Sequence, residues 1–519
     1  MSSLPLLLAQ DGGKLSADLM QNFGAMAPEM FLCVMVVVML VVDLVRSKGP
    51  STLYPWLSLG GIVVAAGLVI SGSGDLTVGY DDFAALRVDG LGRLFKLVFL
   101  AAAALTVLFI VRSGRKYGRE GEFQVILFGA LAGMCYLASA TELIGFYVAF
   151  ELVSYTGYLM AGYRLDSAKG AEAAGKYVIF GSVASAVMLF GITLILGFAG
   201  TTSFEGIVDV LLAADAGVPA LWVGATFTFA GFAYKAAAFP FQFWCPDVYE
   251  GAPAPVAGFL AVASKAAAFA IGLRILALVP VAGGVVGTPE LGQLFAHDAA
   301  FLEKLLIVAS VCTMTWGNLA ALRQTNLQRM LAYSSIAHAG YLLLASSMVL
   351  RTDVATDALM AIGFYFLIYL CMNLGAFWIV TMMRRDLDSV DVTALKGLGW
   401  KQPLLGTCFV IMLVSLTGLP PTAGFVGKLL LFMPVIHEGF YLFAAIGLVN
   451  GAVSLYYYAK PMREMFLKKP DDDTKLIDCV GGDMALVVAL TVPLVVLGVY
   501  GWGDLASVAR DAVAIVGGR

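Results

Sequence analysis

Long apolar segments recur along almost the whole chain, and they constrain its fold more than any other feature. A helix needs about 20 mostly apolar residues to cross the hydrocarbon core of a membrane. Only 13% of the residues are charged, whereas a soluble protein carries about 25%. We therefore predict an all-α polytopic membrane protein with about 14 transmembrane helices. The predicted spans lie near 28–46, 53–71, 90–111, 122–139, 142–163, 175–199, 219–240, 254–278, 302–322, 328–349, 355–383, 403–433, 439–462 and 482–502.

Sequence patterns typical of soluble cofactor chemistry are missing. The net charge of −4 is too small to suggest binding to nucleic acid. The seven cysteines are scattered singly, and without a C-x-x-C pair the sequence predicts no iron–sulfur or zinc framework. No phosphate-binding loop and no dinucleotide-binding glycine motif occurs. We expect no cofactor and no metal in this chain, so any redox or ATP chemistry would belong to another protein.

The distribution of lysine and arginine between the loops predicts the orientation of the chain in the membrane. Short loops rich in these residues face the cytoplasm. The loops after odd-numbered spans are rich in them, except the loop after span seven, which carries Asp247 and Glu250 instead. With an even number of spans, both termini are expected outside the cytoplasm. The basic loop residues are Arg46, Lys48, Arg112, Arg115, Lys116, Arg119, Arg164, Lys169, Arg323, Arg384, Arg385, Lys396, Lys401, Arg463, Lys468, Lys469 and Lys475.

Four ionisable residues lie well inside predicted spans: Glu151, Lys235, Lys265 and Lys428. A charge at the centre of a span costs about 2.5–3.5 kcal/mol, so such residues turn inward, pair or become hydrated. Desolvation in general lowers the pKa of a lysine, and a nearby carboxylate raises it again. A glutamate and a lysine whose separation changes can therefore load and release a proton. The alternatives are a structural ion pair, or side chains that reach the membrane surface from the ends of spans.

Two further ionisable residues lie in the spans, and one of them allows more than one interpretation. His338 lies in span ten and is either a hydrogen-bonded core histidine or a member of a proton relay. Arg274 lies near the end of span eight, and we expect its guanidinium to extend towards the membrane surface.

Two predicted spans are interrupted by proline. Pro240 interrupts span seven, and Pro420 and Pro421 interrupt span twelve, each within about two helical turns of a lysine. Interrupted helices at matching positions in two halves indicate an inverted repeat. We predict two inverted five-helix repeats, spans 4–8 and 9–13, each with one broken helix. The predicted domains are an N-terminal three-helix segment at 1–120, a first repeat at 121–280, a second at 301–465, and a C-terminal helix and tail at 480–519.

Three sequence runs resemble the antiporter-like membrane subunits of respiratory complex I, and most of all the subunit N family of bacterial NADH:quinone oxidoreductase. The resemblance covers roughly 120–465. It implies a proton relay of Glu151, Lys235, Lys265, His338 and Lys428. Gln242 departs from the family, which often has histidine there. The runs are KAAAFPFQFWCPDVYEGAPAPVAGFLAVASKAAA, RMLAYSSIAHAGY and GLPPTAGFVGKLLLF.

The resemblance also implies a function and its partners. The chain would be a non-redox subunit of a translocase in the bacterial inner membrane, with both termini on the periplasmic side. It would move protons from the cytoplasm outward, driven by electron transfer elsewhere. NADH, FMN, iron–sulfur clusters and quinone would belong to partner subunits of the membrane arm and the peripheral redox arm, and lipids would surround the chain. Two alternatives stay open: a subunit of a cation/proton antiporter without redox chemistry, and a scaffold whose charges form static ion pairs.

Overall fold

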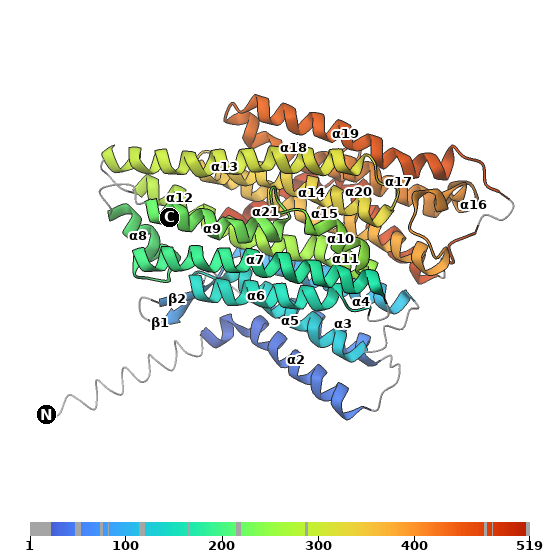
Figure 1. Cartoon of the computed structure of the whole chain (residues 1–519), viewed down its shortest axis with the longest axis horizontal. Coiled ribbons are helices and arrows are strands. Elements are labelled where there is room, and N and C mark those ends of the chain that lie inside the picture. The colour runs from blue at the N-terminus through green and yellow to red at the C-terminus, as the bar shows by residue number, and fades with distance from the viewer. Residues whose placement is uncertain are drawn as a thin grey trace.

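Helices make up nearly all of the structure, a computed structural model that describes residues 22–46, 53–72, 76–80, 83–113, 120–164, 167–213, 219–285, 289–471, 475–479 and 481–514. The elements (Figure 1) are α2 (Ala27–Val45), α3 (Leu53–Ser71), β1 (Leu76–Tyr80), β2 (Phe83–Val88), α4 (Gly90–Arg112), α5 (Glu120–Ser139), α6 (Leu143–Ala161), α7 (Ala168–Ala199), α8 (Phe204–Ala213), α9 (Pro219–Ala236), α10 (Trp244–Gly251), α11 (Ala254–Phe259), the π-helix η1 (Leu260–Ser264), α12 (Lys265–Val285), α13 (Pro289–Ala321), α14 (Leu327–Ser347), the 3-10 helix η2 (Met348–Leu350), α15 (Ala355–Asp386), the 3-10 helix η3 (Val392–Leu395), α16 (Leu398–Lys401), α17 (Pro403–Thr417), α18 (Ala423–His437), α19 (Tyr441–Phe466), α20 (Gly482–Val499) and α21 (Trp502–Ala514).

The helical membrane architecture predicted from the sequence is confirmed. Within the described ranges, twelve helices are long and apolar enough to cross a membrane. Of the other two predicted spans, 219–240 contains α9 and ends before α10 begins, and 403–433 contains α17 and most of α18. The count of fourteen therefore stays a prediction. The structure adds two features that the apolar pattern did not indicate, the antiparallel hairpin of β1 and β2 and the helix α21.

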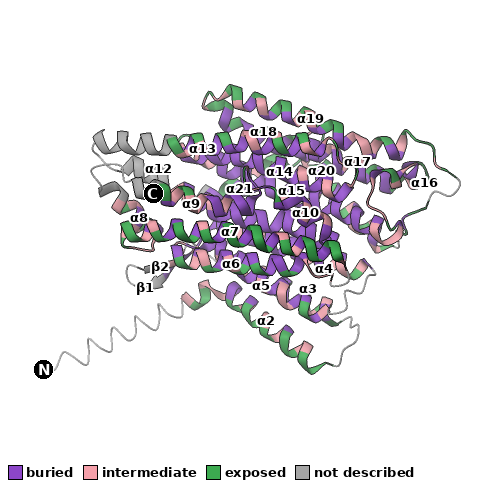
Figure 2. Cartoon of the chain, viewed as in Figure 1, coloured by how far each residue is buried: buried purple, intermediate pink, exposed green. Residues whose placement is uncertain are grey.

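The most deeply buried helices lie in the middle of the molecule. Helix α14, the run from α11 to α12 and helix α15 are almost completely covered by other helices. Figure 2 shows buried residues concentrated on α10, α14 and α15, and exposed residues on α2, α7 and α19. Trp378 of α15 has no exposed surface and stacks on Phe109 of α4, with ring centroids 4.6 Å apart. Because membrane lipid can cover apolar side chains on outer helices, the buried polar residues of the central helices are the informative ones.

Both proline-containing segments lie between two separate helices. Helix α9 ends at Ala236, directly after Lys235, and the chain becomes helical again only at Trp244. Helix α17 ends at Thr417, and α18 begins at Ala423. Gly418 between them has φ 84°, a conformation that favours glycine, and a Cβ there would lie 2.6 Å from Cδ of Lys428. The interruption and the close approach of the lysine therefore require the same glycine.

A third irregularity lies directly before Lys265. The five residues Leu260–Ser264 form a π-helix between α11 and α12. Such single-turn π segments widen a helix locally and are frequent at functional sites. The sequence contains no proline here, so the pattern of residues predicted an ordinary helix.

The two groups of spans predicted as repeats make corresponding contacts. In the first group, α10 packs on α7 and α12 packs on α5; in the second, α18 packs on α15 and α19 packs on α13. These pairs occupy equivalent places in the order of the predicted spans. The inverted relation between the groups and the domain boundaries stay predictions.

Candidate proton-transfer site

Lys235 is held in the last turn of α9, where the helix stops. Its side chain is buried, and its Nζ donates a hydrogen bond of 3.1 Å to Oγ of Ser154 on α6. The ring of Phe150 lies 5.7 Å away. Glu151 is half-buried three residues before Ser154, on the same side of α6, and acts electrostatically on the lysine. Among the described residues Lys235 contacts no carboxylate directly, so the predicted Glu151–Lys235 pair is a neighbouring pair, with Ser154 as the contact.

Lys265 lies at the centre of the molecule, immediately after the π-helix. Its Nζ donates to the backbone oxygen of Ser335 at 2.8 Å and to Oγ of the same residue at 2.9 Å. Cys245 of α10 approaches the same hydroxyl group, with its Sγ 3.9 Å from Oγ. Because Ser335 belongs to α14, this lysine of the first predicted repeat is bonded to a helix of the second.

His338 lies one turn further along α14, between two tyrosine hydroxyl groups. Nδ1 is 2.5 Å from Oη of Tyr365, and Nε2 is 3.4 Å from Oη of Tyr458. The hydroxyl group of Tyr458 is also hydrogen-bonded to Ser334. An imidazole can accept a proton on one nitrogen while it gives one from the other. The buried residues Ser334, Tyr458, His338 and Tyr365 therefore form a continuous row of hydrogen-bonding groups, each able to donate and to accept, and we call it the hydroxyl row.

Lys428 stands in the second turn of α18 and points back to the end of α17. Its Nζ donates to the backbone oxygens of Thr417 at 2.7 Å and Leu416 at 3.1 Å. Helix ends leave such carbonyl groups without partners inside the helix, and a cation there is favoured by the helix dipole. The same ammonium lies 4.7 Å from the ring of Tyr341, which in turn contacts the ring of His338. Tyr341 thus separates Lys428 from the hydroxyl row.

The structure therefore groups Lys265, His338 and Lys428 around α14, while Glu151 and Lys235 lie together on α6 and α9. Gln242, the residue that departs from the family, is buried between α9 and α10. Among the described residues, no group of three or more His, Cys, Asp or Glu could hold a metal ion.

The hydroxyl row was not predicted from the sequence. Tyr365, Tyr458, Ser334 and Ser335 are ordinary residues of apolar helices when each is read alone. The sequence did hold one signal for the row, the position of Ser334 and Ser335 one helical turn before His338. The run of tyrosines at 456–458, in a span that has no lysine at the place that matches Lys265, was a second signal.

A surface network of charges holds α10 between the two groups of helices. Asp247 accepts hydrogen bonds from Lys176 at 2.6 Å and from Arg329 at 2.7 Å. Glu250 accepts from Arg329 at 2.8 Å and from Lys169 at 3.3 Å. The loop after span seven lacks lysine and arginine of its own, and α7 and α14 supply them. The acidic loop after span seven, which departed from the pattern of basic loops, thus forms ion pairs with neighbouring helices.

This network predicts a pH-dependent contribution to stability. Burial raises the pKa of Asp247, but the hydrogen bonds from Lys176 and Arg329 lower it more, and the net pKa is below the ordinary value of 3.8. A carboxyl group with a lowered pKa stabilises the folded state above its ordinary pKa, and the contribution is lost as pH falls through the folded value. We expect Asp247→Asn to lower the midpoint of thermal unfolding at pH 7 by about 2 °C.

The difference between this variant and the wild type should disappear below the folded pKa of Asp247, when the wild-type carboxyl group is protonated as well. Glu172→Gln is the control, because Glu172 also contacts Lys176, at 2.8 Å, but is 63% exposed. A deficit of Asp247→Asn that does not diminish as the pH falls from 7 through the range below 3.8 would contradict the assignment.

Arg274 corrects an expectation from the sequence. Its guanidinium does not extend to the membrane surface: it is 4% exposed and binds both carboxylate oxygens of Asp89, at 2.7 and 2.9 Å. It also donates to the backbone oxygen of Ala138. Asp89 has no exposed surface and caps α4 by accepting from the backbone N–H of Gly92. The charge of Arg274 is therefore paired inside the protein, because the carboxylate of Asp89, from a segment distant in the sequence, reaches its guanidinium.

The structure defines a polytopic membrane protein, and interrupted helices with buried lysines at the interruptions are typical of transporters. The model of the family described as NADH:quinone oxidoreductase/Mrp antiporter, TM, matches residues 140–454. A protein named NADH-quinone oxidoreductase subunit N 2, from Chloroherpeton thalassium, is 36% identical over 503 residues, which cover 95% of each chain. The chain belongs to this family of membrane subunits, with subunit N of NADH-quinone oxidoreductase among its relatives. The resemblance seen in the motifs is confirmed.

Solved structures agree with this assignment. A chain of respiratory complex I from Thermus thermophilus is 32% identical and superimposes with a TM-score of 0.75, covering 93% of this chain and 99% of that one. A chain of the Mrp complex from Dietzia sp. is 22% identical with a TM-score of 0.78, covering 95% and 97%. The second likeness shows the fold alone.

Proposed function

We propose that this chain is a proton-translocating membrane-arm subunit of a complex I-type NADH:quinone oxidoreductase. The names of its relatives and the respiratory complex I structure support this assignment. Electron transfer, with NADH, FMN, iron–sulfur clusters and quinone, would take place in partner subunits of the membrane arm and the peripheral arm. This chain would contribute a path for protons and no redox centre of its own.

The observation that carries the proposal is the position of the hydroxyl row between two buried lysines. A proton on Lys265 passes to the Ser335 side of α14, and water among the polar side chains carries it to Ser334 and Tyr458. His338 accepts it on Nε2 and releases another from Nδ1 towards Tyr365. Lys428, beyond Tyr341, receives the proton and releases it at the interruption between α17 and α18.

Glu151 and Lys235 would control loading. In the present arrangement the ammonium of Lys235 is bonded to the neutral hydroxyl group of Ser154. A shift along α6 by less than one turn would bring it to the carboxylate of Glu151, which favours the protonated lysine. Movement between the two partners would bind and release one proton.

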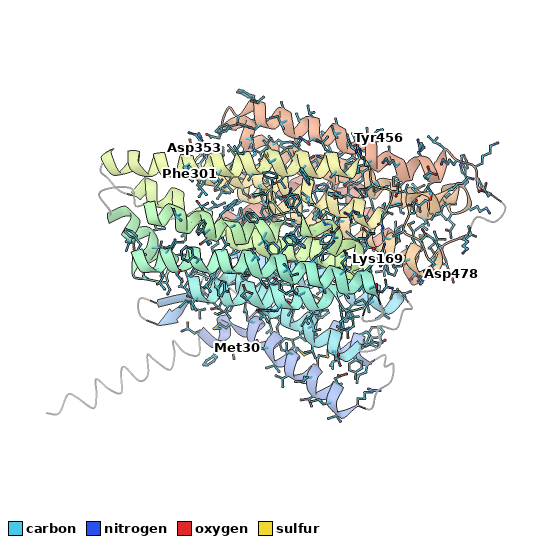
Figure 3. All side chains as sticks on the ribbon, viewed as in Figure 1. Met30, Lys169, Phe301, Asp353, Tyr456 and Asp478 are labelled. Carbon is cyan, nitrogen blue, oxygen red and sulfur yellow. The ribbon has the colours of Figure 1, made fainter. Side chains whose placement is uncertain are left out.

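The direction of transport rests on the orientation of the chain. Figure 3 shows Lys169 and Asp478 towards one end of the molecule, and Phe301 and Asp353 towards the other. The first two lie beside basic loops, and the second two lie beside loops poor in lysine and arginine. This arrangement supports a cytoplasmic face at the Lys169 end. The proton would leave on the opposite, periplasmic side of the inner membrane, where both termini are expected.

Removing one hydroxyl group tests the path. Tyr458→Phe deletes the group that connects Ser334 with His338 and leaves the ring in place. A hydrogen bond to a charged group is worth about 1.5 kcal/mol, so we expect proton flow through this chain to slow about tenfold. The measurement is the ratio of protons moved to electrons transferred by the assembled complex in sealed vesicles.

The control is Tyr54→Phe, the same change at a buried tyrosine of α3, whose hydroxyl group donates to Oδ1 of Asp43 at 3.1 Å outside the hydroxyl row. This variant should keep the wild-type ratio. Equal ratios in both variants and the wild type would remove the hydroxyl row from the path.

The second candidate function is a cation/proton antiporter subunit without redox chemistry. The description of the matching family, which includes Mrp antiporters beside NADH:quinone oxidoreductase, favours it. Dependence of transport on sodium separates the two: a redox-driven proton channel should work equally well with sodium or with potassium, and an antiporter of sodium should not.

A further inference from the structure

A groove of about 590 Å³ lies between α17 and α19, on the outer surface of the second predicted repeat. Val410, Met462, Phe466 and Leu467 make most of its surface apolar. Lys460 and Arg463 lie on the same groove, on successive turns of α19. None of the residues that form the proposed proton path lines it. The groove is therefore a separate feature of the lipid-facing side of the chain.

On the basic side of the groove, the described cations outnumber the described carboxylates that contact them. Nζ of Lys460 donates to the backbone oxygens of Leu322 and Gln324, which fix its position without neutralising it. Arg463 is 3.5 Å from Glu464, whose carboxylate lies closer to Lys468, at 2.8 Å. Arg463 and Lys468 thus share one carboxylate, while Lys460 is bonded to backbone oxygens.

The basic side lies at the level where the chain leaves the membrane. Helix α19 ends at Phe466, and Lys468 and Lys469 follow. Trp400, which is 63% exposed, donates from its indole to the backbone oxygen of Phe466. Exposed tryptophans of this kind mark the interface between the hydrocarbon and the head groups. Figure 3 shows Tyr456, on the same groove, nearer the middle of the helix.

We propose that this groove binds an anionic phospholipid, with its phosphate on Lys460 and Arg463 and one acyl chain along α19. The groove matches such a lipid in charge and in depth. It is cationic at the membrane surface, where the phosphate lies, and apolar towards the hydrocarbon, where the acyl chain lies. Basic pockets between transmembrane helices on the cytoplasmic side bind anionic head groups in this way. The long side chains of lysine and arginine let the charges reach the phosphate from within the apolar region.

Native mass spectrometry of the purified complex tests the proposal. The complex is titrated with phosphatidylglycerol or with phosphatidylcholine of the same acyl chains. We expect the wild type to retain phosphatidylglycerol preferentially. The double variant Lys460→Gln/Arg463→Gln should weaken that binding by on the order of tenfold. The control Lys396→Gln/Lys401→Gln should keep it, because these lysines lie outside the groove and bind Asp471.

Three results would overturn the proposal. They are equal retention of both lipids by the wild type, unchanged retention by the groove variant, and cross-linking of a photoreactive group at Leu467 to protein alone in native membranes. The last result would show that a partner helix covers the groove. If the double variant fails to assemble, Met462→Trp takes its place, since it fills the groove without removing charge. It should reduce the binding of phosphatidylglycerol, and undiminished binding would count against the site.

Discussion

Replacing Lys235 with arginine is expected to lower proton transfer through this chain by on the order of a hundredfold, although the positive charge is kept. The lysine is buried at the end of α9, next to Ser154 and near Glu151. A relay needs a group that releases its proton, and the guanidinium of arginine does not release one in proteins. The measurement is the ratio of protons to electrons in sealed vesicles that contain the assembled complex.

Lys96→Arg is the matched control for this variant. Lys96 is also buried in a membrane helix, and its Nζ forms an ion pair with Glu29 at 2.5 Å. This pair joins α4 to α2, away from the proposed path, so its replacement should leave the ratio unchanged. If Lys235→Arg also kept the wild-type ratio, the charges at Glu151 and Lys235 would be a static part of the scaffold.

Replacing Arg274 with methionine is expected to destabilise the folded chain by about 3–5 kcal/mol, because the buried carboxylate of Asp89 loses the cation that is hydrogen-bonded to it. Asp89 has no exposed surface, and Arg274 supplies two of its hydrogen bonds. The change is measured as a lower midpoint of thermal unfolding and a lower yield of folded protein. Arg87→Ala is the control, since Arg87 lies 3.9 Å from the same carboxylate but is partly exposed.

Adding Asp89→Asn to Arg274→Met should recover much of the loss. Asparagine removes the unpaired charge and still caps α4 through Gly92, as aspartate does. Recovery in the double variant would show that the unpaired charge, and not the volume of the arginine, causes the loss. A single variant Arg274→Met as stable as Arg87→Ala would contradict the role of the ion pair.

The sequence predicted the elements of this fold better than their contacts. Apolar length located the membrane helices, and proline with lysine located both interruptions. These signals are local, since each needs only neighbours along the chain. The pairing of Arg274 with Asp89 could not be predicted in the same way, because the two residues meet only after α4 and α12 pack.

The candidate site shows the same limit. Charges inside apolar spans identified Lys235, Lys265 and Lys428, because a charge in hydrocarbon is rare. Tyr365 and Tyr458 gave no comparable signal, since tyrosine is common in membrane helices and only its partners distinguish one from another. The π-helix before Lys265 could not be predicted from the sequence either, because no proline or glycine pattern specifies it.

Repeated proton transfer along the hydroxyl row requires that its groups reorient after each transfer. Each hydroxyl group that passes a proton onward receives a new one on its other side, so after one transfer every O–H bond points back towards the side from which the proton came. The imidazole of His338 is likewise left as its other tautomer. Every group must turn back before a second proton can follow. Transport along such a row alternates between proton transfer and the rotation of each group back to its starting orientation. The tight packing around Tyr458 and Tyr365 would set the rate of that rotation.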